Sequence, residues 1–234
     1  MIVLALESST QLGGVSIIKD GQVIASESSM RQQSHSEYLN AFVATCLERA
    51  GISLNDVDIF AVGQGPGSFT GIRVASNIGK SFSYIYKKPM VAIDSLVLLA
   101  APVKTKLPVV SIINAYKNMV YFSCFDLSKG LEPTRQSGPI AIPVKDLSEY
   151  VSRDVLVIGD GFETYQEFFP NDLKDKLIRD SQYSDYPKPE TLGLIAEIRA
   201  RHGQTIEWNS FTPLYIRASE AEENKRGVLI SPLK

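Results

Sequence analysis

Residues 2–19 read IVLALESSTQLGGVSIIK: an apolar run, a short polar turn and a second apolar run. Apolar runs of this length, bounded by glycine and small polar residues, predict two buried strands joined by a turn. Asp20-Gly21 is a hairpin signal, and residues 22–27 are expected to add a third strand. Periodicity then favours a helix over 37–50 and a strand over 59–63. The chain therefore begins as a three-stranded meander followed by a helix and a further strand.

The same pattern occurs a second time. Residues 109–126 can be set under residues 2–19 without a gap, with apolar runs falling under apolar runs. Further along, VLVIGDG at 155–161 lies under IFAVGQG at 59–65. Self-similarity of this kind indicates a repeated structural unit. We therefore expect two related α/β lobes.

Length and composition are compatible with two lobes. The chain has 234 residues, of which 44% are hydrophobic and 21% are charged, which is enough for sizeable cores. We place the N-terminal lobe at 1–103 and the C-terminal lobe at 104–234, the latter closed by a helix at 191–202 and ending in a partly irregular tail. A formal net charge of -2 provides no basic surface for binding nucleic acid unaided. Any contact with RNA is therefore expected only through a partner.

Membrane insertion and metal binding find no support in the sequence. The longest wholly apolar stretches, such as residues 96–101, are far shorter than the roughly 20 residues that cross a bilayer. The N-terminus has no basic region ahead of its apolar run, so we expect a cytoplasmic protein. Cys46 and Cys124 lie far apart in apolar stretches, which fits buried free thiols. His35 and His202 form no metal-binding pair, and no metal site is expected.

The first candidate site is the turn after the opening strand. Glu7 ends that strand, and Ser8, Ser9 and Thr10 follow it. A carboxylate can hold a cation or its water, and hydroxyls with the backbone N–H groups of a tight turn can bind phosphate. The alternative is a plain hairpin built from turn-favouring residues. The residues by themselves leave both interpretations open.

The second candidate site is GQGPGSFTG at 63–71, between the strand at 59–63 and a predicted helix over 71–87. Four glycines and a proline in nine residues indicate positive φ angles or a close approach to another group. The helix N-terminus beyond the loop attracts anions, although the loop lacks the Walker and dinucleotide spacings. The candidate nucleotide or partner contacts here are Gly65, Gly67, Ser68, Thr70 and Arg73.

Two helices of the first lobe are candidates for a subunit interface. Over residues 38–47 only two side chains are clearly polar, so this helix is apolar nearly all round. Over residues 71–83 small side chains recur every four positions and would let another helix approach closely, the alternative being a deeply buried helix in a single chain. Ala75→Arg or Gly79→Arg is expected to abolish pairing and leave the single chain folded. The candidate interface residues are His35, Tyr38, Leu39, Phe42, Cys46, Gly71, Ala75, Ile78, Gly79 and Phe82.

These motifs resemble those of the bacterial TsaB (YeaZ) family. The resemblance is carried by the start IVLALESSTQLGGVSII, QQSHSEYL, the loop GQGPGSFTGIRV, GDG at 159–161 and the late PLYIRASEAE, and it extends over essentially the whole chain. It implies a duplicated, two-lobed α/β fold of the actin-like, Hsp70 and sugar-kinase (ASKHA) type. It also implies a role in making the N6-threonylcarbamoyl group of adenosine 37 (t6A37) in tRNA.

The resemblance further implies that the chain is a pseudoenzyme. TsaB proteins are similar to TsaD, the catalytic transferase, and act as its non-catalytic partner and activator. The stretch that matches a His-x-x-x-His metal pair of TsaD is IDSLVLL at 93–99, which has no histidine. In the second lobe Asn114 stands under Glu7 and is followed by the bulky Tyr116 and Lys117. Compared with TsaD, both halves of a nucleotide and metal site are eroded.

The expected partners follow from the same resemblance. The two lobe-one helices are expected to form a heterodimer with TsaD, or a homodimer when TsaD is absent, and the ATPase TsaE joins the assembly. No cofactor is expected except ATP or ADP at the assembled interface, and tRNA is contacted only indirectly. The alternative is a self-sufficient ATP-dependent phosphotransferase of the same fold that uses Glu7 and the glycine loop. A hydrolase has little support, since no Gly-x-Ser-x-Gly elbow occurs.

Overall fold

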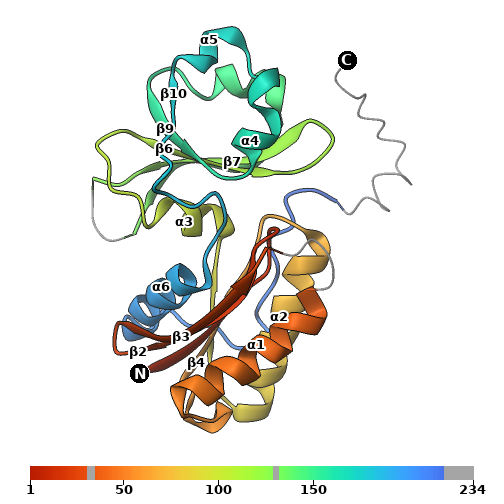
Figure 1. Cartoon of the computed structure of the whole chain (residues 1–234), viewed down its shortest axis with the longest axis vertical. Coiled ribbons are helices and arrows are strands. Elements are labelled where there is room, and N and C mark those ends of the chain that lie inside the picture. The colour runs from red at the N-terminus through yellow and green to blue at the C-terminus, as the bar shows by residue number, and fades with distance from the viewer. Residues whose placement is uncertain (31–34, 129–131, 219–234) are drawn as a thin grey trace. The chain divides into compact units, whose positions relative to one another are not determined.

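A computed structural model describes three stretches of the chain, residues 1–30, 35–128 and 132–218. The chain forms two compact units (Figure 1). Unit 1 comprises Met1–Leu98 and Tyr186–Leu214, and unit 2 comprises Leu99–Asp185 and the chain from Tyr215. The predicted division into 1–103 and 104–234 therefore needs two corrections, because residues 99–103 belong to the second unit and Tyr186–Leu214 belongs to the first. Most of the predicted irregular tail lies outside the described residues.

Unit 1 is built on a five-stranded mixed sheet with the order β3-β2-β1-β4-β5. Its strands are β1 (Ile2–Glu7), β2 (Gly13–Lys19), β3 (Gln22–Ser29), β4 (Ile59–Gly63) and β5 (Met90–Ile93). The first three pair antiparallel as a meander, and β1, β4 and β5 pair in parallel. β1 and β4 are almost entirely buried, as expected for strands covered on both faces. The sheet therefore needs a layer of helices on each side.

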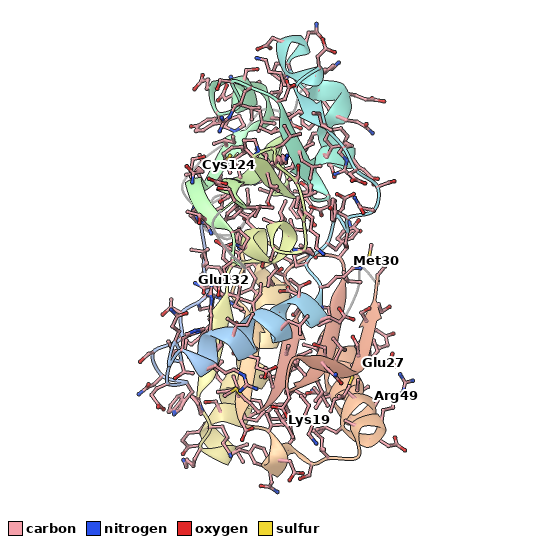
Figure 2. All side chains as sticks on the ribbon, turned by 90° about the vertical axis from the view of Figure 1, so that its left-hand side faces the viewer. Lys19, Glu27, Met30, Arg49, Cys124 and Glu132 are labelled. Atoms are coloured by element: carbon pink, nitrogen blue, oxygen red, sulfur yellow. The ribbon has the colours of Figure 1, made fainter. Side chains whose placement is uncertain are left out.

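Helices α1 (His35–Ala50) and α2 (Phe69–Tyr86) cover one face of this sheet (Figure 1). Their buried side chains share a core with alternate residues of β1, including Leu4 and Leu6. Arg49, near the end of α1, forms an ion pair with Glu27 of β3, and the two side chains lie together in Figure 2. The short η1 (Leu54–Asp56) joins α1 to β4.

The opposite face is covered by α6 (Pro189–Arg201), which the sequence predicts to close the second lobe. A Cβ added to Gly193 of α6 would lie 2.4 Å from Ile18 Cγ1 and 3.3 Å from Ala5 Cβ, so this helix packs directly on β1 and β2. Ser16 Oγ donates to the carbonyl of Pro189 at 2.7 Å, which fixes the start of the helix on β2. The prediction fails because Ser16 and Pro189, which this bond joins, are 173 positions apart, and local patterns do not reveal contacts over such a separation.

Unit 2 repeats the sheet of unit 1, with the order β10-β9-β6-β7-β8. Its strands are β6 (Val109–Asn114), β7 (Met119–Asp126), β8 (Thr134–Pro143), β9 (Val155–Ile158) and β10 (Leu177–Ile178). Its helical segments are η2 (Val144–Glu149), α4 (Gly161–Tyr165), η3 (Gln166–Phe168) and α5 (Asn171–Lys174), and α3 (Ser95–Ala100) contains the boundary between the units. Because each of these strands has a counterpart at the same place in the first sheet, the predicted duplication is confirmed.

Pairing within the two sheets shows where the repeat departs from a gapless match. In unit 1 Glu7 is opposite Gly14, whereas in unit 2 Asn114 is opposite Val120. The turn between the first two strands is therefore one residue shorter in unit 2, and the alignment of 109–126 with 2–19 needs a gap in that turn. Within the part of the chain that the structure describes, no helix is long and apolar enough to span a membrane.

Candidate functional site

The β1–β2 turn is a buried polar cluster. Glu7, Ser8, Ser9 and Thr10 are each no more than 6% exposed. Buried polar groups need hydrogen-bond partners, because leaving one without a partner costs about 1–3 kcal/mol. The neighbours of this turn therefore decide what it can do.

The glycine loop at 63–71 is packed against this turn. A Cβ on Gly63 would lie 1.9 Å from Glu7 Oε2, and a Cβ on Gly67 would lie 2.0 Å from the carbonyl oxygen of Ser9. No larger residue fits at either position without moving the turn. The density of glycine predicted a close approach to another group, and in unit 1 that group is the chain's own turn.

Hydrogen bonds join the turn, the loop and α2. Ser8 Oγ donates to the carbonyl of Gly71 at 2.7 Å, and Ser68 N donates to the carbonyl of Ser9 at 2.6 Å. Ser95 Oγ donates to Ser9 Oγ at 2.8 Å. Ser68 also caps α2, because its Oγ accepts from Gly71 N at 3.2 Å. Three of the residues that the sequence suggested as phosphate contacts, Ser8, Ser9 and Ser68, are thus bonded within unit 1.

Glu7 is the one acidic group of this cluster. Its Oε1 accepts from Ser9 N at 2.6 Å, whereas its Oε2 has no hydrogen-bond partner among the described residues. Burial disfavours the charged form and raises the pKa of Glu7 to about 7, and the hydrogen bonds from Ser9 and Ser8 only partly oppose this shift. Glu7 can therefore hold or release a proton near neutral pH. Residues 1–30, 35–128 and 132–218 contain no group of three or more His, Cys, Asp or Glu arranged to hold a metal.

The remaining loop candidates divide between the cluster and the surface. Gly65 is buried, and a Cβ there would lie 2.6 Å from Ile72 Cδ1. Thr70 is exposed, and Arg73 is exposed with its guanidinium 3.9 Å from the centre of the Phe69 ring. The structure therefore brings Gly67 and Ser68 to the turn, packs Gly65 against Ile72 of α2, and leaves Thr70 and Arg73 on the outside. These two stay predicted contacts for a partner.

The equivalent turn of unit 2 has a different chemistry. The N–H of Asn114 donates to Asp160 Oδ1 at 2.9 Å, and Asn114 Oδ1 accepts from Tyr116 N at 2.8 Å and from Tyr165 Oη at 3.0 Å. Burial, with a smaller contribution from the nearby Asp185, raises the pKa of Asp160 to about 6. Neither Asp160 nor Tyr165 was predicted to be a functional residue. The repeated Gly-x-Gly at 159–161 was the signal available for Asp160, whereas the sequence contains no comparable signal for Tyr165.

The small-residue stripe of α2 faces its own sheet and not another subunit. Gly71, Ala75, Gly79 and Ser83 are all buried, and a Cβ on Gly79 would lie 2.4 Å from Val62 Cγ1 of β4. The structure therefore corrects the prediction for Gly71, Ala75 and Gly79, because the close approach that small residues permit is made to β4.

The other interface candidates fall into two groups, one buried in the core of unit 1 and one half-buried at its surface. Leu39 and Cys46 of α1 are 1% and 0% exposed and belong to the core of unit 1, so they too are corrected. Tyr38, Phe42, Ile78 and Phe82 are half-buried and keep part of their surface accessible. His35 is the first residue of α1, and its side chain lies outside the described part of the structure.

Comparison with known proteins gives a consistent family. The family described as TsaD, tRNA N6-adenosine threonylcarbamoyltransferase, matches residues 22–225. The tRNA threonylcarbamoyladenosine biosynthesis protein TsaB of Haemophilus influenzae is 25% identical over 93% of this chain and 94% of its own length. The TsaB protein of Bacillus subtilis is 23% identical over 95% of this chain and 96% of its own.

The fold leads to the same family. The structure of YeaZ from Pseudomonas aeruginosa superposes with a TM-score of 0.80 and 26% identity, covering 92% of this chain and 99% of that chain. With its duplicated sheets, the protein has the two-lobed actin-like, Hsp70 and sugar-kinase (ASKHA) fold that the sequence predicts. The chain belongs to the TsaB (YeaZ) family, within the wider TsaD family, and has a role in tRNA threonylcarbamoyladenosine biosynthesis.

Proposed function

We propose that this chain is a non-catalytic partner that binds TsaD as a heterodimer and activates it for t6A37 synthesis. In this proposal it docks through the solvent-facing side of α1 and α2. The observation that carries the proposal is the uncharged outer side of α1 between Tyr38 and Leu47, together with an apolar stripe on α2.

On α1, no side chain between Tyr38 and Leu47 is charged, although Asn40, Ala41 and Ala44 are exposed. A helix facing only water usually carries charged residues on its outer side. The fully buried centre of a protein interface is depleted of charged residues, so the composition of α1 suits an interface.

α2 adds an apolar stripe beside this side of α1, although Arg73 and Lys80 elsewhere on α2 are charged. Val74, Ile78 and Ile85 are spaced by four and seven residues and therefore share one side of the helix. Ile85 is 61% exposed, and the other two are half-buried. Because α1 and α2 are in contact, a partner helix could meet both. This surface replaces the small-residue stripe as the proposed docking face.

The β1–β2 turn, residues 7–10, is closed off by the glycine loop, and we call it the sealed turn. It supports the non-catalytic part of the proposal. A phosphotransferase needs an open loop whose N–H groups and acid meet a nucleotide. Here Ser8, Ser9 and Ser68 are bonded within unit 1, and the position equivalent to Glu7 in unit 2 is Asn114. We propose accordingly that ATP or ADP binds only where TsaD or TsaE completes a site.

The test uses two arginine substitutions at exposed positions of the docking face, Ala44→Arg and Ile85→Arg. Both sites are exposed, so the single chain should stay folded. Asn171→Arg, at an exposed position of unit 2, is the matched control. We expect the first two variants to lose co-elution with TsaD and stimulation of tRNA modification, and the control to keep both.

The assay also separates the alternatives. tRNA modification is measured with TsaD and its threonylcarbamoyl-adenylate donor, with and without this chain, and with this chain alone. Normal pairing and stimulation by both arginine variants would reject the docking face. ATP turnover or tRNA modification by the lone chain would instead favour the phosphotransferase alternative. Sedimentation of the lone chain and its variants tests whether the same face forms a homodimer.

A further inference from the structure

A cavity of about 460 Å³ opens at the outer edge of β5 in unit 1. Its wall is formed by β5, the end of α6 and the segment 204–212, and it includes Gln64 next to β4. All of these elements belong to unit 1. The cavity is separate from the α1–α2 docking face, because its lining includes no residue of α1 or α2.

Hydrogen bonds fix both ends of the segment that encloses the cavity. Met90 and Ile206 form an antiparallel bridge, with both N–H···O bonds at 2.8 Å. The chain then leaves the sheet edge and returns at Leu214, whose N–H donates to the carbonyl of Gln64 at 2.8 Å. Between these anchors Phe211 is 4% exposed and packs in the core of unit 1. The opening is therefore built by the fold.

The backbone of β5 adds a polar wall. Hydrogen-bonding directions alternate along a strand, so Ala92 directs its N–H and C=O to the same outer edge as Met90. The carbonyl of Ala92 accepts from Arg199 Nη1 at 3.4 Å, which is long for a hydrogen bond. The Arg199 guanidinium is thus placed in the cavity wall, where its several N–H groups can also donate to a carboxylate.

The side chains of the cavity favour a small anion that also carries hydroxyl or amide groups. Among the described residues that line the cavity, Arg199 is the one with a charged side chain. Thr205, Ser210 and Thr212 add hydroxyl groups, and Val91 adds an apolar wall. A guanidinium binds a carboxylate through two parallel hydrogen bonds. The volume falls in the range of about 300–1,000 Å³ found for small-molecule sites.

We propose that this cavity binds a small hydroxy-carboxylate of amino-acid size. The carboxylate pairs with Arg199, and the hydroxyl group bonds to the threonine and serine side chains of the wall. An extended peptide is less suited to the site, because Ile206 already occupies the outer edge of β5 at Met90, next to Ala92.

The test follows backbone amide resonances of the full chain during titration with L-threonine. We expect shifts at Ala92 and Thr205. L-threoninamide, which lacks the carboxylate, and the Arg199→Gln variant should each bind at least about tenfold more weakly. Arg201→Gln is the matched control, because Arg201 lies on the same helix but is not among the described residues that line the cavity. Thr205→Val tests the hydroxyl contribution without touching the arginine, and it should also weaken binding.

Three results would overturn the proposal. One is the absence of shifts at the cavity with L-threonine up to about 50 mM, a limit that excludes even weak binding. A second is equal binding of the acid and the amide. The third is inorganic phosphate binding as tightly as threonine, which would reassign the cavity to anions in general. None of these results bears on TsaD docking, so the two proposals fail independently.

Discussion

The pH dependence of stability provides a direct test of the sealed turn, and Glu7 is the residue to change. In the folded protein burial raises the pKa of Glu7 from 4.5 to about 7. Between pH 4.5 and about pH 7, Glu7 therefore keeps its proton in the folded protein but has released it in the unfolded chain. Stability from this group is fully present below pH 4.5 and is lost as pH rises through about 7.

The size of the effect follows from the shift. A change of about 2.5 pKa units at about 1.4 kcal/mol per unit amounts to about 3 kcal/mol of lost stability above pH 7. Glu7→Gln removes the titration and keeps an acceptor for Ser9 N. We therefore expect the stability of the variant relative to the unsubstituted chain to rise by about 3 kcal/mol from pH 4.5 to pH 8. Groups that titrate in both proteins cancel in this difference.

The assay is urea unfolding across this pH range, followed by tryptophan fluorescence. Trp208 is the single tryptophan of the chain and lies in unit 1 with Glu7, so its signal reports the relevant unit. Glu48→Gln, at an exposed position of α1, controls for the loss of one carboxylate. A difference between Glu7→Gln and the unsubstituted chain that stays constant with pH would refute the argument. Such a result would mean that water or a hydrogen-bond donor contacts Glu7 Oε2 and keeps the pKa of Glu7 near its ordinary value.

Three further predictions concern packing and the second turn. Gly79→Arg should unfold unit 1, at a cost above about 4 kcal/mol, because its Cβ would already meet Val62; soluble, folded Gly79→Arg by circular dichroism would contradict this. Asp160→Asn should remove a loss of stability between pH 3.8 and about 6, seen by urea unfolding followed with circular dichroism, and a slope equal to that of the parent would count against it. Cys124, labelled in Figure 2, should react with a thiol reagent before Cys46, since Cys46 is fully buried and its pKa is raised to about 11. If Cys46 in the Cys124→Ser variant reacted faster than Cys124 does in the unsubstituted chain, Cys46 would not be buried.

Local sequence patterns predicted the positions of most strands and helices well, but predicted less well which of them pack together. The strands predicted within 2–19 and at 59–63, and their counterparts within 109–126, match the structure, because apolar runs between turn residues are local signals. β8 and β10 were not predicted, since β8 is only partly buried and β10 has two residues. The position of α6 depends on contacts with β1 and β2, which no local pattern encodes.

The small-residue stripe shows how one pattern can have two structural meanings. Glycine and alanine at every fourth position allow a close approach, but the pattern does not say to what. In α2 the approach is to β4, because Val62 fills the space beside Gly79. The half-buried side chains of Tyr38, Phe42 and Ile78 were predicted for the interface, and their exposure keeps them available for one.

The glycine loop at the candidate site also shows that a pattern which permits a close approach does not identify the group that makes it. Loops of this kind are read as phosphate sites because glycine lets a ligand approach the backbone. Gly63 and Gly67 are instead required by Glu7 and by the carbonyl of Ser9. A substitution at either glycine would therefore disturb unit 1 whether or not a nucleotide is ever bound. For this reason, loss of activity in a glycine-loop variant cannot identify a nucleotide site in this protein, whereas Thr70 and Arg73, which lie outside the sealed turn, can be changed to test contacts with a partner.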